Sequence, residues 1–257
     1  MAAASSSVGA GVISLLRTTE TLLQPPLRPR AATSAYIGIV NLFDTDSILA
    51  PDPEGMAILH DREYRVRAYR KADDRILIRG AVRDQKPPGL YLANDPEPLT
   101  IHHMQFDMEI AFPSLEIVDA GVVFETHPMT GCPTITEHYG KLIGLSIARG
   151  FTHKVREIFG GPRGCTHTTA LLQAMAPVAM QCFWSMRAAS AREEGIEGGV
   201  APPGDDQSWR MNIGTCHMWA EDGEHVAELE AGAGFGVPVF LEQRLAKLGI
   251  EPDAWTG

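Results

Sequence analysis

The 257-residue sequence has few cysteines and no long apolar run. Its four cysteines are scattered, which excludes a disulfide scaffold and leaves free thiols or metal ligands. The most apolar stretch, residues 168–186, is interrupted by Gln173, Pro177, Gln181 and Ser185. Because a membrane-spanning helix needs roughly twenty consecutive apolar residues, this stretch predicts a buried helix, and we expect no membrane partner.

The sequence also lacks an excess of positive charge. Its formal net charge of −10 argues against nucleic acid as a partner, because nucleic-acid affinity depends on many Lys and Arg side chains that reach phosphates. Lys and Arg outnumber acids in residues 61–86, whereas residues 192–257 are acidic. The basic stretch suits an anionic small molecule, so we expect a small-molecule substrate; a homo-oligomer is compatible with this sequence.

The N-terminal region differs from the rest in composition. Residues 1–35 are rich in Ala, Ser and Pro, and Pro25-Pro26 and Pro29 block regular structure. No positive charge precedes the short apolar stretch 8–16, as a secretory signal would require. We therefore expect a disordered leader over residues 1–35, a single globular domain over residues 36–257, and a cytoplasmic protein.

Alternation of apolar and polar residues predicts an antiparallel sheet in the first half of the chain. The clearest pattern places Met104, Phe106 and Met108 on one face and Gln105 and Asp107 on the other. The expected strands cover residues 35–42, 64–68, 76–82, 99–112 and 116–126.

Beyond residue 126 the apolar period lengthens to that of a helix. The expected helices begin near Pro133, span 152–159, run from 164–168 to about 187 with a kink at Pro177, and span 239–248. Alternation returns at 209–219 and predicts a strand, followed by a hairpin through 221–223. This order favours an α+β fold class, with an antiparallel sheet packed against a small set of helices that includes one long central helix.

The sharpest local signal is Gly164-Cys165-Thr166-His167, where a glycine-rich turn meets the long helix. The N–H groups and dipole of a helix start stabilise a thiolate or an anionic ligand. Two helical residues two positions apart would point roughly 200° apart, so a shared site requires the helix to begin at His167 or later. The alternative is a small buried Cys beside a His that caps the helix.

Three further residues are candidates for acid/base chemistry. His102 and His103 are consecutive on a strand and therefore face opposite sides; His102 shares the apolar face, as a core histidine or a site residue. Asp84 and Lys86 are expected in a loop that ends the early hairpin, where desolvation would suit them to proton transfer. Alternatively, Asp84 and Lys86 are an exposed pair in a turn without a catalytic role.

Cysteine and histidine side chains also suggest a metal. Cys132, Cys165, His167 and His127 have the ligand types that zinc or iron prefers. Metal sites usually draw two ligands from one short segment, and only Cys165-Thr166-His167 provides such a pair. No cofactor is therefore assured, and zinc or iron stays open.

The block from residue 78 to about 187 resembles the bacterial domain-of-unknown-function family 2889. The resemblance rests on the order of several short motifs, namely Asp84 with Lys86, Ile101-His102 with Met104, Cys132, Leu142-Ile143-Gly144-Leu145, and Gly160-Gly161 leading into Gly164-Cys165-Thr166-His167. Two residues depart from the pattern: His103 replaces an expected acid, and Thr168 replaces the usual Leu. The resemblance implies a companion of enzymes that degrade aromatic or steroid-like compounds.

Two functions compete on this basis. The first is a small-molecule enzyme, a lyase or hydrolase acting on an apolar, aromatic or steroid-like substrate, with catalytic candidates Cys165, His167, His102, Asp84 and Lys86. In this version Cys165 is a nucleophile or ligand, a histidine moves a proton, and Lys86 polarises an anionic oxygen. The second is a non-catalytic ligand- or metal-binding accessory protein of a catabolic pathway. In a third interpretation these polar residues are structural: they cap a helix and provide hydrogen-bond partners within the core, and the function lies elsewhere on the surface.

Overall fold

The computed structural model describes residues 48–148, 150–195, 207–234 and 236–251. The chain divides into two units, residues 1–55 and 56–257, and every helix and strand of the described residues belongs to the second. The expected leader over residues 1–35 and the expected strand at 35–42 lie outside the described residues.

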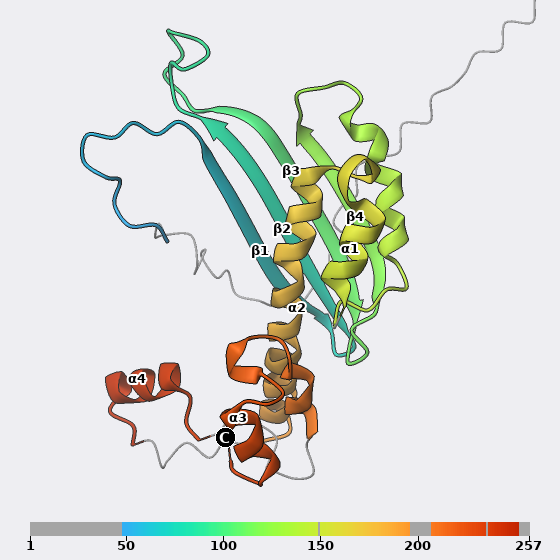
Figure 1. Cartoon of the computed structure of the whole chain (residues 1–257), viewed down its shortest axis with the longest axis vertical. Coiled ribbons are helices and arrows are strands. Elements are labelled where there is room, and N and C mark those ends of the chain that lie inside the picture. The colour runs from blue at the N-terminus through green and yellow to red at the C-terminus, as the bar shows by residue number, and fades with distance from the viewer. Residues whose placement is uncertain (1–47, 149, 196–206, 235, 252–257) are drawn as a thin grey trace, which may run out of the picture. The chain divides into compact units, whose positions relative to one another are not determined.

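A four-stranded antiparallel sheet forms the first part of the second unit (Figure 1). Its strands pair in chain order and are β1 (Asp61–Ala72), β2 (Arg75–Lys86), β3 (Leu99–Ala111) and β4 (Ile117–Thr126). The four strands expected in this part of the chain are confirmed. Because neighbours run antiparallel, the start of β1, the end of β2 and the start of β3 lie at one end of the sheet; Asp84 pairs with Arg62 and with His102 there.

The two faces of the sheet differ in character, as the alternation predicts. The inner face carries the main core, which includes Ile76, Ile78, Val82, Met104, Phe106, Met108 and Ile110. The outer face carries charged side chains in cross-strand ion pairs such as Arg79 with Asp107 and Arg83 with Glu63. The apolar side chains thus define which residues of each strand point inward.

Helical segments follow the sheet: η1 (Cys132–Leu142), α1 (Phe151–Phe159), η2 (Gly161–Arg163) and the long α2 (Thr166–Glu193). Helix α2 crosses β1, β2 and β3 on their inner face (Figure 1). It packs tightly against Gly80, where an added Cβ would lie 2.7 Å from the sulfur of Met175. The α+β class with one long central helix is confirmed, although the segment that begins near Pro133 is a 3-10 helix.

Helix α2 begins at Thr166, one residue earlier than a shared Cys165–His167 site was expected to allow. Cys165 is the N-cap residue and has an extended backbone, with φ −91° and ψ 133°. Because Cys165 itself is not helical, the divergence of two helical side chains does not apply to this pair. Pro177 lies inside α2.

The C-terminal part corrects two expectations. The expected strand at 209–219 is wrong: this stretch contains the 3-10 helices η3 (Gln207–Asn212) and η4 (His217–Trp219), separated by a turn at Gly214 with φ +75°. The expected hairpin at 221–223 is also wrong, because α3 (Glu224–Glu230) follows. Helix α4 (Val239–Leu248) is confirmed.

The apolar residues that produced this false strand pattern form a separate small cluster. Trp209, Val226 and Leu229 are buried together, with Ile213 and Trp219 against them. Alternation over so few residues does not distinguish a strand from short helical turns. Across the described ranges, no helix combines the length and apolar character needed to cross a membrane.

Candidate functional site

A buried carboxylate, Asp84, organises the candidate site. Its side chain is 1% exposed and lies on the inner face of β2, so the expectation of a loop position is wrong. The strand continues to Lys86 because it pairs with β1 as far as Gln85 and with β3 as far as Lys86. A carboxylate buried among apolar residues is unstable unless it is paired and hydrogen-bonded.

Arg62 on β1 supplies the main partner of this carboxylate. Its Nε and Nη2 donate to Asp84 Oδ1 at 2.5 Å and to Oδ2 at 2.7 Å, a two-point pair that fixes the plane of the carboxyl group. His60 adds its Nε2 at 3.4 Å from Oδ1. Neither residue is predicted from the sequence, because the alternation does not reveal the strand register that places Arg62 opposite Asp84.

Two histidines from different elements meet the other carboxylate oxygen. His102 Nδ1 on β3 and His167 Nε2 on α2 each lie 3.1 Å from Asp84 Oδ2. Their rings stack with centroids 3.9 Å apart and planes 30° apart. The side chains are 18% and 15% exposed, so solvent reaches both imidazoles.

Cys165 extends this arrangement beyond His167. Its Sγ lies 3.7 Å from His167 Nδ1, so carboxylate, imidazole and thiol form a continuous chain. An ionised carboxylate accepts hydrogen bonds only, and the His167 nitrogen that faces it therefore carries the proton. The Nδ1 lone pair of the neutral ring is then directed toward the thiol.

Buried hydroxyl groups hold the backbone around Cys165. Its N–H donates to the Tyr139 hydroxyl at 3.0 Å, and its carbonyl accepts from Thr168 Oγ1 at 3.1 Å. The Tyr139 and Thr168 hydroxyls are also hydrogen-bonded to each other. Burial raises the pKa of Tyr139, with these hydrogen bonds acting in the opposite direction, so the phenol stays protonated at neutral pH.

The electrostatics favour an ionised carboxylate beside a neutral imidazole. Burial alone would raise the pKa of Asp84, but the hydrogen bonds and charge of Arg62, with His167 and His60, outweigh burial and lower it below its usual range. Burial and the neighbouring His102 lower the pKa of His167 from its usual value, and the attraction of Asp84 opposes this shift only in part. His167 is thereby kept available as a proton acceptor.

The remaining predicted site residues do not join this cluster. The ammonium of Lys86 lies 5.9 Å from the centre of the Tyr91 ring, and no described hydrogen bond or ion pair links it to Asp84. His127 Nδ1 lies 2.8 Å from the carbonyl oxygen of Met129, and Cys132 begins η1 with its N–H bonded to the same oxygen. The metal ligand set expected from the sequence is therefore not brought together.

A different ligand set does converge. Within the described ranges, one group of three ligand-type residues meets, Asp84, His102 and His167, with one ligand atom from each all within 4.8 Å of one another. Of the four metal candidates predicted from the sequence, only His167 belongs to it. Cys165 approaches the other nitrogen of that ring.

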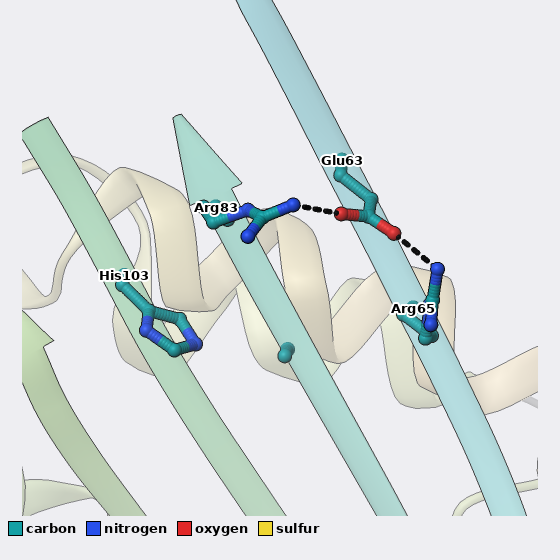
Figure 2. A pocket seen from close by; sticks show the side chains of 5 residues that line it. Glu63, Arg65, Arg83 and His103 are labelled. Carbon is teal, nitrogen blue, oxygen red and sulfur yellow. Dashed lines mark hydrogen bonds and ion pairs between the residues drawn. The ribbon is translucent and has the colours of Figure 1, made fainter. Parts of the chain in front are cut away.

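A second polar cluster lies on the outer face of the sheet. Figure 2 shows Glu63 between Arg83 and Arg65, at 2.9 Å and 2.8 Å, with His103 on the neighbouring strand. These side chains, with Ala81, line a shallow hollow. Strand alternation places this hollow on the opposite face from Asp84, so it is not part of the candidate site.

The fold and the site together define an α+β protein with a buried carboxylate, two histidines and a cysteine at the start of its long helix. Residues 60–181 match the model of the family described as protein of unknown function (DUF2889), which confirms the expected resemblance over this segment. No curated protein and no solved structure matches the chain.

Proposed function

We propose that this protein is a thiol-dependent hydrolase of small-molecule esters, with Cys165 as nucleophile, His167 as base and Asp84 as the residue that orients His167. The observation that supports it is the continuous chain from Asp84 Oδ2 through both nitrogens of His167 to Cys165 Sγ, at 3.1 Å and 3.7 Å. Nucleophile, base and orienting carboxylate in series characterise activated thiols and hydroxyls. A lyase would need a base directed at a substrate carbon, whereas this base faces a thiol.

The reaction proceeds in two halves. Cys165 Sγ attacks the acyl carbon while its proton passes to His167 Nδ1; the bond to the alcohol oxygen breaks, and the leaving alcohol takes that proton. Water then attacks the resulting thioester and gives a proton to His167, which returns it to the Cys165 sulfur as the carboxylic acid leaves. Asp84 holds the Nε2 proton throughout and favours the tautomer that accepts at Nδ1.

Backbone donors for the developing oxyanion come from the start of α2. The first N–H groups of a helix have no intrahelical partner, and no side chain caps this end of α2. The N–H groups of Thr166 and His167 adjoin the nucleophile and are suited to stabilise negative charge on the acyl oxygen. The positive end of the helix dipole, which lies at this terminus, also stabilises negative charge on the acyl oxygen.

An apolar substrate suits the surroundings of the site. The segments that lead into β1 and connect β2 to β3 begin or end at the sheet end that carries Asp84 and His102. They present large exposed apolar side chains: Met56, Ile58, Leu59, Leu90, Tyr91 and Leu92. Such a concentration of exposed apolar side chains is typical of a binding region. We therefore propose an ester with an aromatic or steroid-like body.

The experiment that tests this function is hydrolysis of a panel of nitrophenyl esters, from acetate to aromatic and polycyclic acids. Wild type should release nitrophenol and show an acyl adduct on Cys165 by mass spectrometry; Cys165→Ser should lower turnover by at least about 1,000-fold. Cys216→Ser, which changes an exposed free cysteine, is the matched control. Turnover that persists in Cys165→Ser excludes the proposal, and tight binding of the esters without turnover indicates the accessory-protein alternative.

A further inference from the structure

We infer that Asp84, His102 and His167 form a binding site for a divalent transition-metal ion, and that an ion bound there switches off the thiol of Cys165. The inference rests on the proposed function for its second half only. The three residues come from β2, β3 and α2, so the site is assembled by the tertiary fold.

The spacing of the ligand atoms suits one ion. Ligands about 2.1 Å from a common ion are separated from each other by about 3.0–3.4 Å at octahedral to tetrahedral angles. Both imidazole nitrogens lie 3.1 Å from Asp84 Oδ2, inside that interval. One ligand atom from each of the three residues lies within 4.8 Å of the other two.

The chemistry of the ligands narrows the choice of ion. Two imidazoles and one carboxylate are typical of zinc and ferrous iron, and three protein ligands leave coordination positions open for water or another small ligand. The partial exposure of both histidines gives an ion access from solvent. Arg62 donates to both oxygens of the Asp84 carboxyl group, and these hydrogen bonds hold a ligating carboxylate in place.

Metal binding and thiol activation compete for one imidazole. An ion on His167 Nε2 occupies that lone pair, and the single proton of the neutral ring must then sit on Nδ1, which faces Cys165 Sγ. A protonated Nδ1 cannot accept the thiol proton. The same ring therefore serves either the ion or the nucleophile, and a bound ion inhibits ester hydrolysis.

The test is a calorimetric titration of chelator-treated protein with Zn²⁺ alone. Wild type should bind one ion per chain, and His102→Gln should weaken binding by at least about 100-fold, since even outer partners of metal ligands are worth 10–100-fold. His103→Gln is the matched control, because His103 is the next residue on the same strand and faces the opposite side. Circular dichroism establishes that each variant is folded.

The outcomes separate this inference from the proposed function. Cys165→Ser should bind Zn²⁺ as wild type does, because its sulfur is not a ligand; this result stands even if ester hydrolysis proves independent of Cys165. Absence of stoichiometric binding, equal binding by His102→Gln, or loss of binding in His103→Gln overturns the site. If Zn²⁺ binds but leaves hydrolysis by wild type unchanged at saturating ion, the switch is overturned.

Discussion

The two faces of the sheet carry similar sets of side chains, each with an arginine, a carboxylate and a histidine at neighbouring positions of the same strands. The inner set is Arg62, Asp84 and His102, and the outer set is Glu63, Arg83 and His103, on the same three strands. The carboxylates differ sharply in environment: Asp84 is 1% exposed, whereas Glu63 is 33% exposed. Residue type alone therefore does not make a site in this sheet. The inner set is distinguished by burial beneath α2 and by His167 and Cys165 at the start of this helix.

The largest expected difference between the faces is in catalysis. His167→Ala should slow ester hydrolysis by about 100- to 10,000-fold, the range that general-base catalysis contributes, whereas His103→Ala should leave it within about twofold of wild type. Steady-state kinetics on a nitrophenyl ester measures both. Equal losses in the two variants would mean that the inner face has no special catalytic role.

The next effect is on stability. Asp84→Ala removes the shared partner of Arg62 and two histidines, and should lower the free energy of unfolding by about 1.5–3 kcal/mol, the range for hydrogen bonds to a charged group, because Arg62 is 39% exposed and stays hydrated. Glu63→Ala breaks an exposed pair and should cost no more than about 1 kcal/mol. Chemical denaturation of both variants checks this; a small loss in Asp84→Ala would show that water replaces the carboxylate as the partner of Arg62 and the histidines at low cost.

Two glycines provide a third comparison, of stability, in which no charged side chain is changed. A Cβ on Gly80 would lie 2.7 Å from the sulfur of Met175, so Gly80→Ala should displace α2 and destabilise the fold by about 1–3 kcal/mol. A Cβ on Gly121 meets nothing within 4 Å. Gly121→Ala should be neutral or slightly stabilising, by up to about 1 kcal/mol. Thermal unfolding curves rank the two variants, and an unchanged Gly80→Ala would argue against close contact of α2 with β2.

The smallest expected effect is a pH dependence. Because the pKa of His167 is lowered on folding, the unfolded chain binds more protons than the native chain between the two pKa values. The stability contributed by neutral His167 is therefore fully present above its ordinary pKa and is lost as pH falls through the lowered value. His167→Gln should flatten the acid side of the curve of unfolding free energy against pH; an unaltered curve contradicts the lowered pKa.

Much of the sheet was predictable, because apolar alternation sets which side chains of β1 to β4 point inward. The opposite directions of His102 and His103 follow from that alone, and the Cys165-Thr166-His167 signal marks the helix start correctly. Strand register and end points were not predictable. Asp84 was therefore assigned to a loop beside Pro87-Pro88, although pairing on both sides extends β2 through it.

Other failures have the same origin in tertiary contacts. The sequence around Arg62 and His60 does not mark them as site residues, since their contact with Asp84 depends on how β1 pairs with β2. Cys132 and His127 have the right ligand chemistry, but the fold directs the His127 ring to the backbone of Met129. Residues 209–219 alternate because Trp209 and Trp219 pack in a small cluster of their own, which short helical turns satisfy as well as a strand.

The meander order of β1, β2 and β3 also fixes when the site is completed. The contacts of Asp84 with Arg62 and His102 join strands that are adjacent in the chain, so they form from local pairings. His167 at the start of α2, and Cys165 just before it, are distant in the chain from these strands. The base and the thiol therefore meet the carboxylate only when the long helix packs on the sheet.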